Sequence, residues 1–218
     1  MLRGELTGLR ALTDADIEIF ETELLTDVDT RVRATGRPWV PVTPGAADSP
    51  YRQPEDRAAV VRFAVVELAT GDLAGEAVMS GIDLHNRRAE IGLVLRPACR
   101  GRHLGTDVVR VLCHYGFSVR GLHRIQITTL ADNHAMIAAA VRAGFVLEGT
   151  AREAAWIDGG FADGVTTGAD GRYRLEGLRR GAPPGPRFMA WLNGGFADGV
   201  TLSQLSAEWS PAGRSTGR

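Results

Sequence analysis

The sequence predicts a mixed α/β fold, in which helices flank a central, mostly antiparallel sheet. Through the middle of the chain, short apolar runs of strand length alternate with segments whose apolar residues recur at helical spacing. The last third returns to strand-like segments separated by glycine-rich turns. The chain has 218 residues, 44% of them hydrophobic, which is enough for one core. We therefore expect a single domain over residues 1–209 and a disordered polar tail over 210–218.

Composition and charge exclude several classes of protein. The formal net charge is -1, so electrostatics gives no reason to expect nucleic acid or an anionic membrane as a partner. Cys99 and Cys113 are the only cysteines, too few for a disulfide framework or a cysteine-based metal site. No segment approaches the roughly 20 apolar residues of a membrane span, and the N-terminus lacks the apolar run of a signal peptide. We expect a cytoplasmic protein without a metal.

The first quarter of the chain predicts a strand, two helices and a long loop. A strand over Leu6–Leu12 ends at Thr13, which forms a helix-start signal with an acid three residues later. A second helical stretch covers Val28–Ala34. The loop from Pro38 to Pro54 is too rich in proline for regular structure. Two interpretations stay open for it: a functional cover, or a surface loop anchored by its two aromatic side chains.

Turn residues divide the middle of the chain into further elements. A tight turn at Thr70-Gly71-Asp72 predicts a hairpin, and Gly121 and Gly144 follow the ends of two helices. The expected strands are Arg62–Leu68, Leu73–Ile82, Ile91–Leu95, His123–Leu130 and Phe145–Trp156, and the expected helices are Thr106–Arg120 and Ala135–Ala143.

The stretch from Glu90 to Phe117 organises the rest of the chain. A strand is followed by a turn rich in glycine and arginine, and Thr106 and Asp107 then open a helix. A strand, turn and helix start of this kind direct unpaired backbone N–H groups at one point, which is the geometry that holds a phosphate or pyrophosphate. The pattern also fits an ordinary connection with arginines on a solvated rim. The residues alone leave both interpretations open.

Two motifs carry a family resemblance. The turn Arg100–Gly105 matches the motif Arg/Gln-x-x-Gly-x-Gly/Ala at its first and last positions, with His103 where the middle glycine is usual. Downstream, Asp132–Ala135 and Ala143–Phe145 resemble the asparagine-bearing loop and the helix end of the same enzymes. From about Leu6 to Trp209, with one interruption, the chain resembles the GNAT acyltransferase superfamily, and within it the RimJ/RimL-like N-acetyltransferases.

The resemblance implies an N-acetyltransferase that moves an acetyl group from acetyl-CoA, as co-substrate, to a primary amine by direct attack in a ternary complex. The amine would belong to a protein N-terminus or a small molecule, and a homodimer is left open. The resemblance assigns the pantetheine arm to exposed main chain of one strand, the pyrophosphate to the turn and helix start, and an orienting role to the loop asparagine. The assigned residues are Leu93, Val94, Leu95, Arg100, Gly101, Arg102, His103, Leu104, Gly105, Thr106 and Asn133.

Acetyl transfer also requires a neutral amine. A lysine-like amine has a pKa of about 10.4, so a general base would raise its reactive fraction. Glu90 is the first candidate, because it lies on the strand beside the expected acyl site. Alternatively, Glu90 is solvated or pairs with Arg87 or Arg88. His85 and His134 are weaker candidates, and each also fits a surface or capping residue.

The remaining catalytic tasks concern the carbonyl oxygen and the leaving thiolate. A backbone N–H of Val94 or Leu95 is the expected donor to the oxyanion. The helix after the asparagine loop offers Met136 and Ala140 where related enzymes often carry a proton donor, and neither can donate. A free thiol has a pKa of about 8.5, so its thiolate can leave without an acid. Asn133 is a candidate catalytic or coenzyme-orienting residue, or only a helix N-cap.

The C-terminal third contains a duplication. Ala155–Thr166 recurs 35 residues later as Ala190–Thr201, with ten of twelve positions identical. Two copies are too few for a solenoid. We interpret residues 167–201 as an insertion that duplicates a hairpin tip, with Thr167–Met189 as a projecting arm. The final strand, Leu202–Glu208, is then expected to pair with the strand that precedes the first copy and to complete the core.

A second class of function is a non-catalytic acyl-CoA-binding protein. His103 at a glycine position, the lack of a proton donor and the insertion all fit it, and release of free thiol with a panel of amines would separate the two. A nucleotide-binding regulator is disfavoured, because the chain has no Walker-type lysine and no Rossmann glycine spacing.

Overall fold

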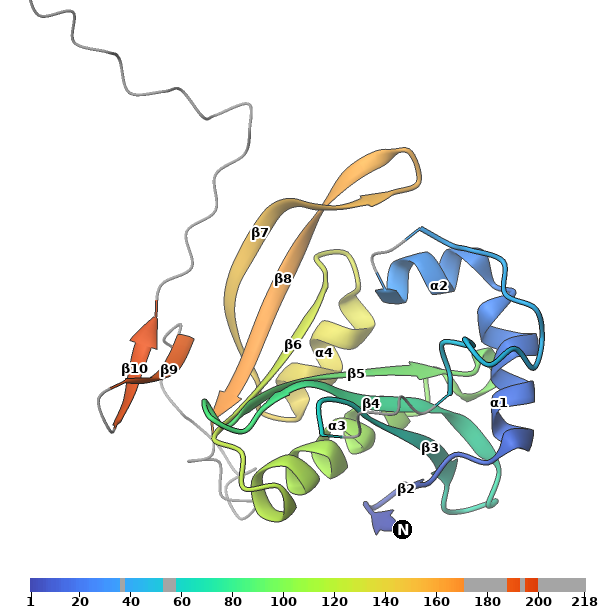
Figure 1. The fold of residues 1–218 in the computed structure, drawn as a ribbon, viewed down its shortest axis with the longest axis horizontal. Coiled ribbons are helices and arrows are strands. Elements are labelled where there is room, and N and C mark those ends of the chain that lie inside the picture. The colour runs from blue at the N-terminus through green and yellow to red at the C-terminus, as the bar shows by residue number, and fades with distance from the viewer. Residues whose placement is uncertain (36–37, 53–57, 171–187, 193–194, 200–218) are drawn as a thin grey trace, which may run out of the picture.

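One large sheet forms the centre of the molecule (Figure 1). The computed structural model describes residues 1–35, 38–52, 58–170, 188–192 and 195–199. Eight strands lie in the order β1-β2-β3-β4-β5-β6-β8-β7, antiparallel at every pairing except β5 with β6. They are β1 (Leu2–Arg3), β2 (Thr7–Arg10), β3 (Val61–Glu67), β4 (Leu73–Asp83), β5 (Arg88–Leu95), β6 (Arg124–Leu130), β7 (Val146–Ile157) and β8 (Gly160–Asp170).

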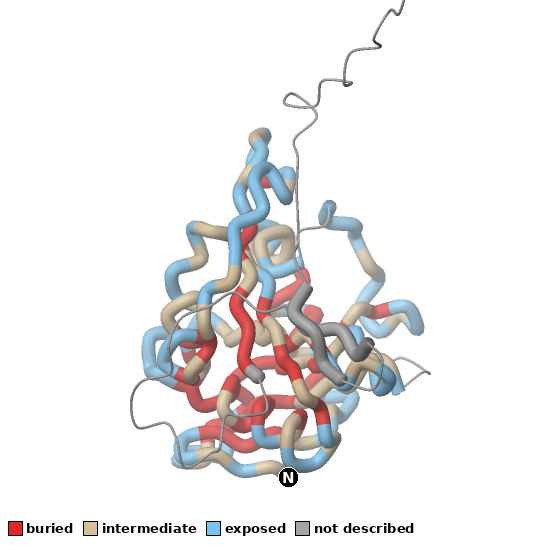
Figure 2. Tube along the Cα trace, turned by 90° about the vertical axis from the view of Figure 1, so that its left-hand side faces the viewer, coloured by how far each residue is buried: buried red, intermediate tan, exposed pale blue. Residues whose placement is uncertain are grey.

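Helices cover both faces of this sheet, which confirms the predicted fold class. Buried side chains of α3 and α4 share one core cluster with β4, β5 and β6, and those of α1 and η1 form a second cluster against β3 and β4. Figure 2 shows the buried residues gathered along the centre of the sheet. The helices are α1 (Asp14–Phe20), α2 (Val28–Thr35), α3 (Leu104–His114) and α4 (His134–Arg142), with π-helical turns η1 (Glu21–Leu25) and η3 (Tyr115–Val119) and a 3-10 turn η2 (Pro97–Cys99).

The start of α1 matches the sequence signal. Thr13 is the N-cap, its hydroxyl accepts the N–H of Asp16, and the Asp16 carboxylate accepts the N–H of Thr13, which completes a capping box. Arg10 holds the same carboxylate through a bidentate ion pair. The preceding strand is shorter than the predicted Leu6–Leu12.

The duplicated segment departs from the prediction. The strand that pairs with β7 is β8, reached through the first copy of the repeat, and β8 also pairs with β6. β8 consists of Gly160–Thr166, from the first copy, and of the residues that follow it up to Asp170. Thr167, the predicted start of the insertion, lies inside β8 and is 1% exposed. The continuous pairing to β6 from Gly164 to Asp170 gives the physical reason, because it satisfies the backbone of β6 along its whole length.

The second copy forms a hairpin of its own. β9 (Phe188–Leu192) pairs with β10 (Gly195–Gly199) in the register of the first copy, since Trp191 is the backbone partner of Phe196 as Trp156 is of Phe161. The expected strand Arg172–Leu175, the final strand and the polar tail lie outside the described residues. Among the described helices, none is long and apolar enough to cross a membrane.

Candidate active site

The parallel strands β5 and β6 separate along their length. β5 pairs with β6 only at Arg88, Ala89 and Glu90, whereas it stays paired with β4 as far as Leu95. The N–H of Arg96 donates to the carbonyl of Ala74 at 2.9 Å, which fixes the alternation on β5. Since hydrogen-bonded and non-hydrogen-bonded pairs alternate in an antiparallel ladder, the main-chain groups of Leu93 and Leu95 point away from β4. Beyond Glu90 they face the gap between the two strands.

The glycine- and arginine-rich turn ends at the start of α3, two residues earlier than predicted. His103 is the N-cap, in the left-handed region with φ 62° and ψ 3°, and Gly101 also has a positive φ of 74°. Histidine thus adopts the conformation for which glycine is usual. The first backbone hydrogen bond runs from Asp107 N to His103 O at 3.5 Å.

Three backbone donors precede that bond. In the part of the chain that the structure describes, the N–H groups of Leu104, Gly105 and Thr106 have no hydrogen-bond acceptor, and the N-cap side chain supplies none. Unpaired N–H groups and the helix dipole together favour an anion here. The predicted geometry for a phosphate is therefore present at the N-terminus of α3.

Asp107 has a different role from the predicted helix-start residue. Its carboxylate is buried and accepts the N–H groups of Glu5, Leu6 and Thr7 and the hydroxyl of Thr7, at 2.7–3.0 Å. Gly4 makes this approach possible, because a Cβ there would lie 2.4 Å from Asp107 Oδ2. The first turn of α3 is thereby tied to the β1–β2 turn, a long-range contact that no local pattern signals.

Two arginines of the turn are held by the protein. Arg100 Nε donates to the carbonyl of Leu95 at 3.1 Å, and Arg102 forms an ion pair with Glu67 at the end of β3. Both guanidinium groups remain part of an exposed rim beside the helix start. The Cα of Gly105 is directed into the protein, unlike the two exposed arginines. A Cβ added there would lie 3.8–4.0 Å from the side chains of Leu93, Leu95 and Ala139. Gly105 therefore borders the space between β5 and α4.

Glu90 lies where β5 and β6 begin to part. It is half-buried, and among the described residues its carboxylate has no hydrogen-bond or ion-pair partner. The arginines considered as partners bind elsewhere, Arg87 to the carbonyl of Gly121 and Arg88 to Asp83. Val94 packs against the cluster under α1, so Glu90, four residues earlier, shares that face of the sheet. His85 and His134 are both exposed.

Asn133 caps α4. Its Oδ1 accepts the N–H of Met136 at 3.2 Å, and its Nδ2 donates to the hydroxyl of Thr129 at 3.0 Å. The Oδ1 contact is that of an N-cap, and the Nδ2 contact ties the cap residue to β6. Met136 is partly buried and Ala140 is fully buried. Neither side chain carries an acidic proton, so this helix presents no proton donor at those two positions.

A buried polar cluster on the α1 side of the sheet was not predicted. Glu76 on β4 is 5% exposed, pairs in register with Val94, and forms an ion pair with Arg62 on β3. Burial raises the pKa of Glu76, and Arg62 opposes this effect. Burial also raises the pKa of Tyr51 to about 12, and Arg31 stacks over its ring at 5.5 Å. The sequence did carry one signal for this cluster: Glu76 is a lone carboxylate within the apolar run of β4.

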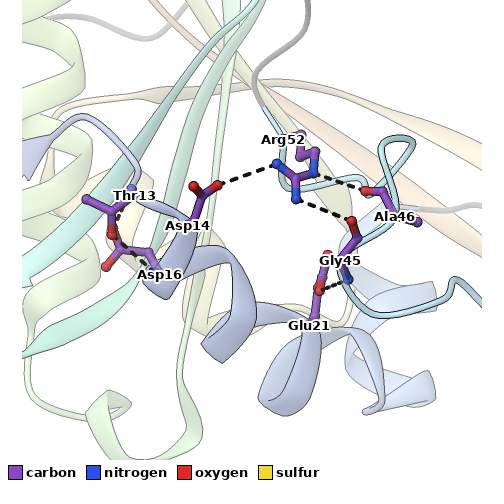
Figure 3. Close-up of polar contacts among 7 residues, drawn as sticks. All are labelled: Thr13, Asp14, Asp16, Glu21, Gly45, Ala46 and Arg52. Atoms are coloured by element: carbon purple, nitrogen blue, oxygen red, sulfur yellow. Dashed lines mark hydrogen bonds and ion pairs between the residues drawn. The ribbon is translucent and has the colours of Figure 1, made fainter.

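The loop after α2 is anchored to α1 and η1 (Figure 3). Arg52 donates to the carbonyls of Ala46 and Gly45 at 3.0 and 3.4 Å, and its guanidinium lies 3.5 Å from Asp14. The N–H of Gly45 donates to Glu21 at 2.8 Å. The loop aromatics add two contacts, since Tyr51 packs on Phe20 and the indole of Trp39 donates to Leu25 O. The anchoring interpretation is thus supported, and covering of a substrate stays a prediction.

Comparison with known proteins decides the family. The model of the GNAT acetyltransferase domain matches residues 7–146. The chain belongs to the GNAT acetyltransferase family. The match covers β2 to the start of β7, which includes the splayed strands, the α3 start and the Asn133 loop. The narrower RimJ/RimL-like assignment stays a prediction.

Individual relatives are distant. The putative ribosomal N-acetyltransferase YdaF of Bacillus subtilis is 33% identical over 92 residues, 42% of this chain and 50% of that protein. Spermidine N(1)-acetyltransferase of Escherichia coli K12 is 26% identical over 95 residues, 44% of this chain and 51% of that protein. The matches thus span about half the length of these curated relatives.

A solved structure shows the same fold over a longer stretch. Spermidine N-acetyltransferase from Vibrio cholerae, solved in complex with CoA and spermine, superposes with a TM-score of 0.68 at 20% identity, covering 77% of this chain and 97% of that chain. Within the described residues of our protein, no group of three or more His, Cys, Asp or Glu could hold a metal ion.

Proposed function

We propose that this protein is an N-acetyltransferase that transfers the acetyl group of acetyl-CoA to a primary amine by direct attack in a ternary complex. One observation carries the proposal. The unpaired N–H groups of Leu104, Gly105 and Thr106 lie at one end of β5, whose main chain at Leu93 and Leu95 faces an open gap. Family membership and the N-acetyltransferase names of its relatives support it.

The start of α3 would hold the pyrophosphate. Its three N–H groups donate to phosphate oxygens, and the positive end of the helix dipole favours their charge. The buried carboxylate of Asp107 does not oppose this, because four donors from the β1–β2 turn face it. Arg100 and Arg102 add positive charge on the rim. The pantetheine arm would then extend along β5 past Gly105.

The acetyl carbonyl would lie beside β5. The main chain of Val94 is directed at β4, since a Cβ on Gly75 would lie 2.2 Å from Val94 O. This supports Leu95 over Val94 as the backbone donor to the oxyanion. The amine nitrogen attacks the carbonyl carbon, negative charge develops on the oxygen, and the carbon–sulfur bond breaks to release the thiolate. Because Met136 and Ala140 cannot donate, the thiolate takes its proton from solvent.

Glu90 would take one proton from the bound ammonium and so leave the neutral amine that attacks; the second proton, lost from nitrogen once the carbon–nitrogen bond has formed, passes to solvent. It lies at the closed end of the gap, half-buried, and has no partner among the described residues. We expect Glu90→Gln to lower kcat/KM at neutral pH by about 10²–10⁴-fold, the range of general-base catalysis, and to shift the acidic limb of the pH–rate profile. Coenzyme affinity should be unchanged. A pH–rate profile that superimposes on that of the parent would assign the base to water or to another residue.

The acceptor class is tested by release of free thiol from acetyl-CoA with a panel of amines. The panel contains spermidine, because the Escherichia coli relative is a spermidine N(1)-acetyltransferase, and short peptides with free N-termini, because YdaF is a putative ribosomal N-acetyltransferase. We expect thiol release that depends on an added amine. Tight binding of acetyl-CoA without release for any amine would instead support a non-catalytic acyl-CoA-binding protein.

A further inference from the structure

The layer formed by η1 and α2 is attached to both sides of the gap between β5 and β6. On one side, Arg96, directly after β5, forms a bidentate ion pair with Glu23 of η1. On the other side, Arg33 of α2 contacts Asp132, two residues after β6, at 2.6 Å. The layer therefore bridges the strands at their open end. In Figure 1, α2 lies opposite α4 across this opening.

α2 is weakly held compared with the helices around it. It has no buried residue, and none of its residues belongs to either core cluster. Its contact with the cluster under α1 is made by Arg31, whose guanidinium stacks over the ring of Tyr51 at 5.5 Å. The chain that leaves η1 and returns after α2 is closed at its base, where Trp39 Nε1 donates to the carbonyl of Leu25 at 2.9 Å. The contact between Trp39 and Leu25 thus fixes both ends of the segment that contains α2. From there α2 extends toward Asp132, in the loop that precedes α4.

Charged contacts hold the projecting helix. Arg33 and Asp132 are 36% and 60% exposed, and Asp158 at the tip of the β7–β8 hairpin adds to the acidic surroundings of Arg33. At the other end of the helix, Asp27 caps the N–H of Thr30. An exposed ion pair of this kind contributes little to stability and is weakened by salt, so it can open and close.

We propose that α2 is a flap over the open end of the splayed strands, and that the Arg33–Asp132 ion pair is the latch that closes it. In the closed state, the amine side of the gap is bounded by α2, the Asn133 loop and the hairpin tip. An amine reaches a thioester held along β5 by passing this edge. The role in acceptor access rests on the proposed function, whereas the latch itself does not.

Hydrogen–deuterium exchange of the full chain tests the latch without any substrate. Asp132→Asn keeps the shape of the side chain and removes its charge. We expect the amides of α2 to exchange about two- to fivefold faster in this variant, the range that an exposed ion pair supports. Arg33→Gln should accelerate exchange to a similar extent, and combining it with Asp132→Asn should add little further, because both changes remove the same ion pair. At about 1 M salt, where the Debye length is about 3 Å, the parent should approach the variant.

A matched control separates the latch from a general effect of charge. Asp14 lies on α1, away from the gap, and its exposed carboxylate pairs with Arg52 of the loop after α2. Asp14→Asn removes the charge of this carboxylate. Exchange in α2 should not change in this control. Unchanged α2 exchange in Asp132→Asn, or equal acceleration in both variants, would overturn the latch.

The role in access is tested by kinetics with acetyl-CoA and spermidine as the probe acceptor. We expect Asp132→Asn to change the KM for spermidine by about two- to fivefold and to leave the KM for acetyl-CoA unchanged. Faster α2 exchange together with an unchanged KM for spermidine would overturn the role in access. Absence of turnover with every amine would contradict the proposed function and the access role with it, while the exchange measurement still decides the latch.

Discussion

Replacing Asp107 by alanine perturbs the contact that fixes the start of α3. Four donors face this carboxylate: the N–H groups of Glu5, Leu6 and Thr7 and the hydroxyl of Thr7. Glu5 and Leu6 are exposed, so water can replace the carboxylate at their N–H groups. Thr7 is 0% exposed, and its two donors would stay unpaired. A buried unpaired donor costs about 1–3 kcal/mol, so the loss is about 2–6 kcal/mol.

Urea and thermal unfolding followed by circular dichroism measure this loss. For a chain of this size, each kcal/mol lowers the Tm by about 2–4 °C, so we expect a fall of at least about 4 °C. Gly4→Ala should act in the same direction, because its Cβ would displace Asp107 Oδ2. The control is Asp14→Ala, whose side chain is 93% exposed and should change stability by no more than about 0.5 kcal/mol. Equal stabilities of Asp107→Ala and the control would refute the reasoning.

Three further predictions follow from single contacts. Gly75→Ala should weaken coenzyme binding, measured by calorimetry, because a Cβ 2.2 Å from Val94 O must push β4 from β5; unchanged affinity would contradict it. Burial raises the pKa of Asp16, but hydrogen bonds from Arg10 and Thr13 outweigh it and hold the pKa at about 2. Because this lies below the ordinary 3.8, the stability from ionised Asp16 is complete above pH 3.8 and is lost as pH falls toward 2. Asp16→Asn should therefore reduce the acid-side slope of the unfolding free energy, and an unaltered slope would argue against it. His103→Gly should tighten coenzyme binding and raise the Tm, since glycine adopts a φ of 62° without strain; a lower Tm would show that the imidazole contributes contacts of its own.

Local signals in the sequence predicted the elements around the site. The capping pattern at Thr13 and the turn from Arg100 to Gly105 each depend on a few neighbouring residues, and both have the expected form. The helix start was misplaced because Thr106 and Asp107 look like cap residues, whereas His103 takes the left-handed conformation and serves as the N-cap. Local patterns could not show this, because the carboxylate of Asp107 is satisfied by residues about 100 positions away.

Pairings between distant strands were the least predictable feature. The turns of the two copies differ only in Asp158 against Asn193, so sequence alone offers two ways to close the sheet, and in the described residues the first copy leads into β8. The Arg33–Asp132 contact likewise joins residues 99 positions apart, with no local signal. Glu76 differs, since a single carboxylate inside an apolar strand already indicates a buried charge that needs a partner.

Calorimetric titration of acetyl-CoA into Gly105→Ala and Gly105→Val tests the central claim, that the coenzyme lies across the start of α3 and along β5. Gly105 has a helical backbone and its Cβ would meet only ordinary contacts at 3.8–4.0 Å, so alanine should fold at least as well as glycine. The same Cβ points at Leu93, Leu95 and Ala139, into the space proposed for the pantetheine arm. We predict weaker binding in the alanine variant and a loss of at least about a hundredfold, or about 2.8 kcal/mol, in the valine variant, each with an unchanged or higher Tm. Parent affinity in a folded Gly105→Val protein would contradict the account.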